Sequence, residues 1–189
     1  MRLKIIQVGD PVLRQTARAL TPEEILSDET QRLVRDMQET MYDAPGVGLA
    51  APQVGVSLQL AVIEDREDLL KTLTPQELQE KERRPVPFHV LINPKIVQMG
   101  NDSVDFYEGC LSLAGFSAVV PRAPAVRVEY FDGRGELRRI EATGWYARIL
   151  QHEIDHLGGG LYIDRMHTRT FTSLDNWNRF WKAKPIAKA

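Results

Sequence analysis

The stretch Gln151-His152-Glu153-Ile154-Asp155-His156-Leu157 contains the pattern His-Glu-x-x-His. Four residues make about one turn of an α-helix, so a helix would project His152 and His156 from the same face. Two imidazoles so placed can bind one metal ion, and Glu153 could then accept a proton from a water on that ion. The simpler interpretation is a helix with two ordinary histidines, and the pattern alone does not decide between them.

The helix that carries this pattern is predicted to run from about Gly144 to Leu157. Thr143 supplies an N-cap, and Gly158-Gly159-Gly160 ends the helix. Trp145 and Ile149 fall on or beside the face that holds the two histidines.

Other patterns predict one long helix and several strands. Apolar residues at three- and four-residue steps predict a helix over 28–43, which Pro45-Gly46 ends. Asp132-Gly133-Arg134-Gly135 predicts a hairpin turn. Strands are predicted at 58–64, 88–97, 119–120, 125–131 and 137–142, with an extended segment at 161–163. This mixture predicts an α+β fold.

The chain is predicted to form one catalytic domain, residues 1–166, followed by a tail, residues 167–189. The domain contains a charged insertion at about 65–87, whose charges we expect to serve solubility. The aromatic side chains of the tail would fold back onto the body or form a homodimer contact, and the last few residues are expected to be loose.

Composition places the chain among ordinary globular proteins. Of 189 residues 43% are hydrophobic and 26% charged, and the net charge is −2. This charge gives no reason to expect direct binding to nucleic acid or to an anionic membrane. The sequence has no run of about 20 apolar residues for a membrane span and no secretory signal pattern. We expect a cytoplasmic protein, although a processed organellar protein would look the same.

Cys110 is the only cysteine, so it cannot form an internal disulfide. A lone cysteine is usually a small core residue. Here it is also a candidate third ligand, because two imidazoles and a thiolate leave a tetrahedral ion with a fourth position for water, as in catalytic sites. The sequence gives no distance between Cys110 and the histidines, so this grouping is a hypothesis.

The stretch 46–55 is small, apolar and nearly uncharged, and it contains one amide, Gln53. It lacks the ending and the preceding strand of a nucleotide-binding loop. Such a stretch lets backbone approach another chain or a ligand closely. From these residues alone, a tight structural turn is the favoured interpretation.

Three separated blocks occur in order: Gly46-Val47-Gly48-Leu49-Ala50-Ala51-Pro52-Gln53, Glu108-Gly109-Cys110-Leu111-Ser112 and Gln151-His152-Glu153-Ile154-Asp155-His156. Together they resemble the peptide deformylases, metal-dependent hydrolases that remove the formyl group from N-terminal formyl-methionine of new polypeptides and release formate. The resemblance runs from about Gly9 to Arg165. Residues 169–172 are similar to the subgroup that includes mitochondrial and plant forms. The implied fold is α+β, with mostly antiparallel sheets surrounding a central helix that bears the metal.

The resemblance implies a metal centre held by Cys110, His152 and His156. Glu153 would accept a proton from a water on the metal and pass it to the leaving amine. The donor set by itself suits zinc. The resemblance implies one Fe²⁺ per chain, with Zn²⁺, Ni²⁺ or Co²⁺ able to occupy the same site.

It also implies how substrate is bound. The Gln53 side chain and the Leu111 backbone N–H would donate to the developing oxyanion. An N-formyl-Met nascent peptide would pair with 46–49 as an added strand, with transient proximity to the ribosome. The implied substrate-binding residues are Val47, Gly48, Gly109, Trp145 and Ile149, beside His152. For Trp145 and Ile149, ordinary helix packing is an equal alternative.

Three positions depart from the family pattern. Ser117 stands where many bacterial members carry an arginine that contacts substrate. Arg148 is a charge near a usually apolar pocket edge and is expected to point to solvent. Gly158-Gly159-Gly160 replaces a more typical sequence, which puts local rigidity in doubt.

Two other functions compete with this one. A zinc peptidase would take a third ligand downstream of the histidine pair, where His167 and Asp164 are the candidates, and would not need Cys110. A structural metal module would have four protein ligands and no open position.

Overall fold

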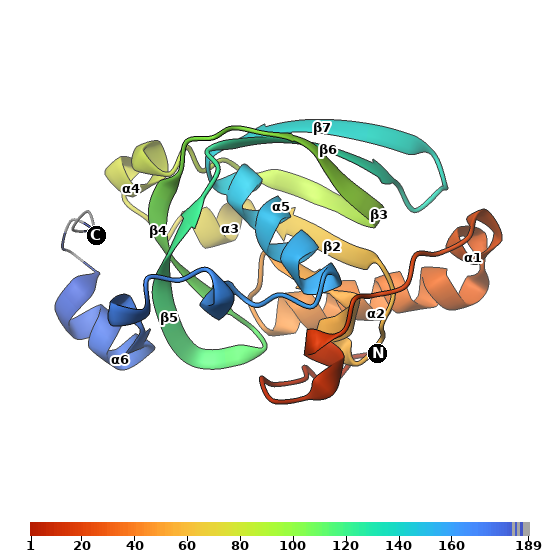
Figure 1. The fold of residues 1–189 in the computed structure, drawn as a ribbon, viewed down its shortest axis with the longest axis horizontal. Helices are drawn as coiled ribbons and strands as arrows, with labels where there is room; N and C mark the ends of the chain where they lie inside the picture. The colour runs from red at the N-terminus through yellow and green to blue at the C-terminus, as the bar shows by residue number, and fades with distance from the viewer. Residues whose placement is uncertain (183, 185, 187–189) are drawn as a thin grey trace.

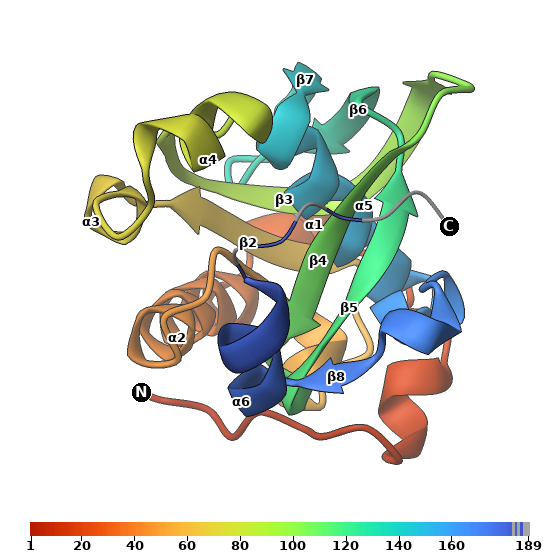
Figure 2. The same cartoon turned by 90° about the vertical axis from the view of Figure 1, so that its left-hand side faces the viewer.

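The computed structural model describes residues 1–182, 184 and 186, and it has the predicted α+β architecture. Two antiparallel sheets lie around one helix, α5 (Figures 1 and 2). The larger sheet has the strand order β1-β2-β3-β6-β7, and the smaller has the order β4-β5-β8. The strands are β1 Gly48–Ala50, β2 Leu60–Asp65, β3 Val86–Met99, β4 Val104–Cys110, β5 Leu113–Arg122, β6 Ala125–Phe131, β7 Leu137–Thr143 and β8 Thr172–Ser173.

The helices are mostly short, apart from α2 and α5, whose bounds agree with the sequence prediction. They are α1 Pro22–Leu26, α2 Asp28–Asp43, α3 Glu67–Leu70, α4 Pro75–Glu80, α5 Gly144–Leu157 and α6 Leu174–Asn176. Tighter turns of 3₁₀ type cover Pro11–Arg14, Ala51–Val54, Tyr162–Asp164 and Thr168–Thr170, and a π-type turn covers Trp177–Trp181.

Strand β2 lies between α5 and α2, and both of its faces are buried. Ala61 and Ile63 belong to the core around α5, whereas Leu60 and Val62 belong to the core around α2. This follows from the period of two along a strand. Burying each large aliphatic side chain contributes about 1.5–3 kcal/mol, so α5 is held firmly from one side.

Strand β3 contains the predicted strand at 88–97 and continues through Asn93-Pro94, although its pairing register with β6 shifts between Ile92 and Lys95. Asn93 adopts a left-handed backbone conformation with φ 49°. Its side chain accepts from the Leu20 N–H at 2.9 Å and donates to the Leu20 carbonyl at 2.8 Å. The predicted extended segment at 161–163 is confirmed only at Leu161, with φ −124° and ψ 154°; it is wrong for Tyr162 and Ile163, which lie in a 3₁₀ turn closed by Asp164, whose side chain accepts from the Leu161 N–H.

The charged insertion contains α3 and α4 and is tied to the body by buried contacts. Asp65 is 1% exposed, and Arg83 donates two hydrogen bonds to it, at 2.7 and 2.8 Å. The Trp145 N–H, at the start of α5, donates to the Lys81 carbonyl at 2.8 Å. The expectation that these charges serve only solubility is therefore wrong for Asp65 and Arg83.

The described part of the tail folds back onto the smaller sheet. Strand β8 pairs with β5, with Ser173 opposite Phe116. The Trp177 ring contacts the Tyr107 ring edge-on, with 5.9 Å between centroids. The prediction that the last residues are loose falls on positions 183, 185 and 187–189, which lie outside the described residues.

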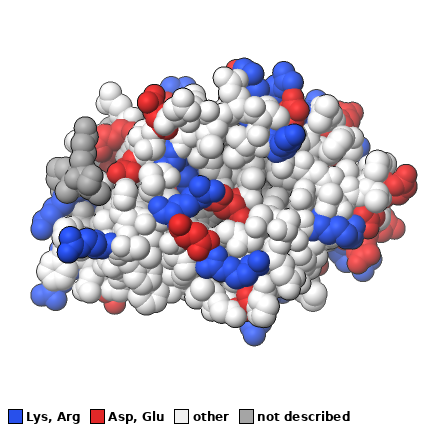
Figure 3. Space-filling view, viewed as in Figure 1, with Lys and Arg blue, Asp and Glu red and all other residues white. Residues whose placement is uncertain are grey.

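Charged side chains of both signs are scattered over the face seen in Figure 3, with uncharged surface between them. Among the residues that the structure describes, no helix has the length and apolar character needed to cross a membrane.

Candidate active site

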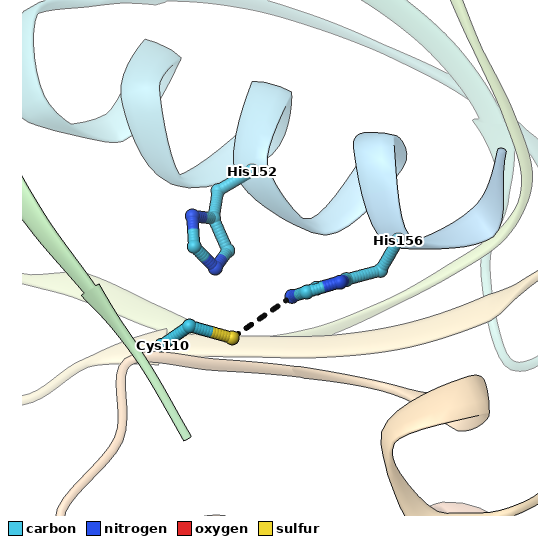
Figure 4. A group of neighbouring side chains, drawn as sticks. All are labelled: Cys110, His152 and His156. Carbon is cyan, nitrogen blue, oxygen red and sulfur yellow. Dashed lines mark hydrogen bonds between the residues drawn. The ribbon is translucent and has the colours of Figure 1, made fainter. Parts of the chain in front are cut away.

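Cys110, His152 and His156 come together although they lie far apart in the sequence. Cys110 ends β4, the two histidines lie on α5, and their ligand atoms are all within 4.8 Å of one another. Figure 4 shows both rings projecting from α5 toward the sulfur, and the Cys110 Sγ lies 3.3 Å from the His156 Nε2. A tetrahedral ion with bonds of about 2.0–2.3 Å separates its ligands by about 3.3–3.8 Å. The donor set and its spacing therefore fit one metal ion.

A buried carboxylate fixes the orientation of one imidazole. Glu108 Oε2 lies 2.9 Å from His152 Nδ1. Because an ionised carboxylate only accepts, His152 donates from Nδ1, and Nε2 is the ring atom left to bind a metal. Burial alone would lower the pKa of His152, but hydrogen bonds to Cys110 and Glu108 raise it, so a metal ion would displace a proton from Nε2. Burial alone would raise the pKa of Glu108, but hydrogen bonds from His152 and Arg122 outweigh it and hold this pKa well below its ordinary value.

Two arginines share Glu108 with the histidine. Arg122 donates to it through Nε at 2.9 Å, and Arg148 donates through Nη1 at 2.7 Å. Arg148 is 4% exposed and also donates to the Val120 carbonyl, so the expectation that it points to solvent is wrong. The charge of Glu108 is thus compensated inside the protein, as a buried ion requires.

Glu153 lies beside the cluster with one oxygen unpartnered. It is 4% exposed, and its Oε2 has no hydrogen-bond partner within the described residues. Burial raises the pKa of Glu153 to about 7. Its other oxygen lies where a Cβ on Gly48 would come within 2.2 Å, so only glycine leaves room at that position. An orphaned carboxylate oxygen suits a group that takes up a proton near neutral pH.

The amide of Gln53 is oriented toward the sulfur. Its Oε1 accepts from the Ala50 N–H at 2.8 Å, and its Nε2 lies 3.4 Å from Cys110 Sγ and 3.2 Å from Ser112 Oγ. The carbonyl end is therefore fixed by the backbone, and the N–H₂ end faces the cluster. Leu111, the second predicted oxyanion donor, follows Cys110 directly and lines the same cavity.

A cavity of about 660 Å³ leads to this cluster. Gly46–Gly48 line one side and Tyr107–Leu111 line the other. The first segment leads into β1 at Gly48, and the second contains the end of β4 and the next residue, Leu111. Each of these strands stands at the end of its sheet. The cavity is thus bordered by two strand edges. All five predicted substrate-binding residues line it: Val47, Gly48, Gly109, Trp145 and Ile149.

Sequence reasoning missed several residues of this site. Glu108 was quoted in a motif but given no role, although a carboxylate near a histidine pair is a typical partner for a metal ligand. Arg83, from the insertion, lines the cavity beside Trp145, with its Cζ 5.3 Å from that ring. Ser117 is buried and donates to the Glu108 carbonyl at 2.8 Å, so it does not face substrate.

The ligands that a peptidase would use are engaged elsewhere. His167 Nε2 lies 3.2 Å from Asp105 Oδ2, and Asp164 accepts from Arg14 at 2.6 Å. Neither belongs to the group around His152. Among the described residues this group holds three side chains, which also disfavours a closed structural site with four protein ligands.

A family model described as polypeptide deformylase matches residues 2–171. The chain belongs to the peptide deformylase family. It is 45% identical over 172 residues to peptide deformylase 1A, chloroplastic, of Solanum lycopersicum, covering 91% of this chain and 62% of that protein. It is 42% identical to the mitochondrial peptide deformylase of Homo sapiens, over 90% of this chain and 70% of that protein. It is 42% identical to peptide deformylase 1 of Bifidobacterium longum, over 97% of this chain and 82% of that protein.

The chain spans 62% and 64% of the lengths of the tomato protein and of a similar Arabidopsis thaliana deformylase. Solved deformylase structures share the fold. The Acinetobacter baumannii class I type b enzyme bound to Met-Ala-Ser has a TM-score of 0.79 at 31% identity, covering 88% of this chain and 99% of that one. The Synechococcus elongatus enzyme in complex with actinonin has a TM-score of 0.73 at 39% identity, covering 98% and 87%.

Proposed function

We propose that this protein hydrolyses the formamide bond of N-formyl-Met peptides and releases formate. The observation that carries the proposal is the meeting of Cys110, His152 and His156 beside the unpartnered Glu153 carboxylate, at a cavity between two strand edges. Membership of the deformylase family and the Met-Ala-Ser complex of the Acinetobacter baumannii relative support the same chemistry.

In this proposal Cys110, His152 and His156 would hold one metal ion, with the sulfur and the two imidazoles as its ligands. When bound, the ion polarises the formyl carbonyl and lowers the pKa of a water at its open position. Glu108 keeps the His152 proton on Nδ1, so that Nε2 stays available. Burial lowers the pKa of His156, which favours the neutral ring that a metal ligand must be.

Glu153 moves the proton. Its Oε2 has no competing partner and can accept a proton from the attacking water, then deliver it to the leaving amine. The Gln53 N–H₂ and the Leu111 backbone N–H donate to the oxygen that gains charge. Losing one such donor typically costs about 2.7–4 kcal/mol of transition-state stabilisation.

The peptide binds as an extended strand between β1 and β4. Both are terminal strands of their sheets and both line the cavity, so their main chains can pair with it. The methionine side chain enters the part of the cavity lined by Val47, Gly48, Gly109, Trp145 and Ile149. Arg148 presents a guanidinium 5.9 Å from the centre of the Trp145 ring and stiffens that wall.

For the metal we propose Fe²⁺ as the active ion, with Zn²⁺, Ni²⁺ or Co²⁺ able to replace it, because a thiolate and two imidazoles accept all of them. We further propose transient proximity to the ribosome and a place in the bacterial cytoplasm. A homodimer contact would use tail residues after α6, outside the cavity lining, where Phe180 and Trp181 are exposed. The plant and human relatives make a mature organellar form the alternative location.

The decisive experiment is anaerobic purification, metal analysis, and an assay for formate from formyl-Met-Ala-Ser. We expect one metal per chain and release of formate that stops when oxygen reaches an Fe²⁺-loaded sample. Absence of formate from protein with bound Fe²⁺ would count against the proposal.

Replacing the sulfur separates this function from the peptidase alternative. Cys110→Ala should lose stoichiometric metal and turnover, because the ion would keep only two protein ligands. A variant with full metal and full turnover would rule out our assignment, since a peptidase centre does not need Cys110.

A further inference from the structure

We propose that Leu174 and Phe116 form a contact surface for the side chain of the residue that follows methionine, and that they set a preference for an apolar residue there. The inference rests on the proposed deformylation and adds to it a residue from the C-terminal segment, outside the three sequence blocks.

Leu174 begins α6 and lines the same cavity as Cys110. It is 41% exposed, and Phe116 in β5 is 42% exposed. Ser173 pairs with Phe116 in the register of β5 and β8, so strand pairing brings Leu174 close to the Phe116 position. Both side chains have free apolar surface at the cavity.

The segment that carries Leu174 is anchored on both sides. Before it, the Phe171 ring stacks on the Phe116 ring, with 5.1 Å between centroids and 8° between planes. After it, Trp177 contacts Tyr107. Because this segment is held at both ends, it loses little conformational entropy when the substrate binds. Contact with Leu174 can therefore contribute to the affinity for the substrate.

Strand geometry indicates which substrate residue contacts the surface formed by Leu174 and Phe116. Successive side chains of a strand point to opposite faces. If the methionine side chain points toward Trp145 and Ile149 on α5, the next side chain points away from α5. Figure 2 shows α6 in front of β4, whereas α5 lies behind it. The residue after methionine is therefore directed to the side where Leu174 lies.

The chemistry of this wall favours an apolar side chain. The charged residues that line the cavity lie at the metal cluster or around Trp145: Glu108 and Glu153 at the former, Arg83 and Arg148 at the latter. A charged side chain next to Leu174 would lose hydration without a partner. Covering some 40–60 Å² of apolar surface at this wall corresponds to about a five- to tenfold change in affinity.

The test compares formyl-Met-X-Ser peptides with X as Ala, Leu or Asp. We expect the unmodified protein to show a KM about fivefold lower for X = Leu than for X = Asp, at similar kcat. Leu174→Ala and Phe116→Ala should each bring the ratio of the two KM values closer to one. Leu174→Lys should change the ratio in favour of the X = Asp peptide. Phe180→Ala is the matched control, because Phe180 is 46% exposed on the same segment and does not line the cavity.

Unchanged ratios in both Leu174 variants would overturn the inference, as would an equal effect of Phe180→Ala. A second copy of the chain covering Leu174 would also overturn it, and size measurement at assay concentration detects such a dimer by its loss in Leu174→Lys. If the unmodified protein releases no formate from any peptide, the proposed function fails and takes this inference with it. Formate release without dependence on X rejects this inference alone.

Discussion

At the scale of single residues, Glu108 connects the proposed metal centre to the core. Its two oxygens accept from His152, Arg122 and Arg148, and all of these groups are largely withdrawn from water. Removing one partner of such a buried group typically costs about 3–5 kcal/mol, because it leaves an uncompensated charge. The same carboxylate thus orients the imidazole of His152, a proposed metal ligand, and fixes the position of Arg148 at the cavity.

Replacing Glu153 with glutamine tests its role in proton transfer. Glu153→Gln should retain stoichiometric metal, since the side chain is not in the ligand group, and should lower kcat by about 10²–10⁴-fold. Metal analysis and formate release measure the two effects. Glu141→Gln, an exposed carboxylate on β7, is the control and should leave both unchanged. A Glu153→Gln protein with normal kcat would remove Glu153 from the mechanism.

The placement of His152 and His156 on one face of α5 could be predicted from the sequence, whereas the environment of Arg148 could not. The spacing of His152 and His156 is set by one helical turn, so it is local information. Arg148 is buried because a carboxylate 40 residues away, on another element, meets it. The spacing of residues in the sequence does not predict this contact between Arg148 and Glu108. Without it, an arginine beside an apolar pocket is expected to be exposed to solvent.

At the scale of elements, the close approach of β1 to α5 depends on Gly48. Gly48→Ala would place a Cβ 2.2 Å from the present position of Glu153 Oε1. We expect this variant to keep its metal but lose at least about tenfold in kcat/KM, since even a 1 Å misplacement of a catalytic group is costly. Gly100→Ala is the control, because nothing lies within 4 Å of its Cβ position. Equal activities for the two variants would contradict this account of Gly48.

The end of α5 depends on one of its three glycines. Gly159 has φ 79°, and a Cβ there would lie 2.8 Å from the Arg14 carbonyl oxygen, whereas Gly158 has φ −89° and only ordinary contacts. Gly159→Ala should lower the free energy of unfolding by at least about 1–2 kcal/mol. Gly158→Ala should change it by less than half as much. Urea unfolding of both variants measures this difference, and equal midpoints would contradict it.

Helices α2 and α5 could be predicted because the apolar period and the breakers after each helix agree. The predicted N-cap of α5, Thr143, makes no side-chain cap hydrogen bond. Strand β4 was missed because Val104–Cys110 lacks clean alternation: burial along the strand does not follow a period of two. The tail was predicted only as aromatic residues that fold back or meet a partner. Its docking depends on Phe116 and Tyr107, which are distant in sequence.

At the scale of the whole molecule, the proposed metal ion would join the two sheets. Cys110 belongs to the smaller sheet, and the histidines lie on α5, which packs on the larger one. Removing the metal with a chelator should therefore lower Tm, because an ion at 100 times its Kd stabilises the folded state by about 2.7 kcal/mol. Amide exchange should increase most in β4 and β5.

Cys110→Ala provides the control for metal removal. Its Tm should not respond to the chelator, since it has already lost the ion. If the unmodified protein and Cys110→Ala respond equally, the stabilising ion binds somewhere else.

The strand edges on either side of the cavity also bear on when such an enzyme can act. Pairing at a strand edge uses main-chain amide and carbonyl groups, which every polypeptide has. Peptides of unrelated sequence can therefore bind at one groove. It also requires a stretch of several residues without structure of its own. Once a client has packed its first residues into a domain, that stretch is no longer offered. If the proposed function holds, processing at this groove would therefore fall in the interval between emergence of a chain and its folding.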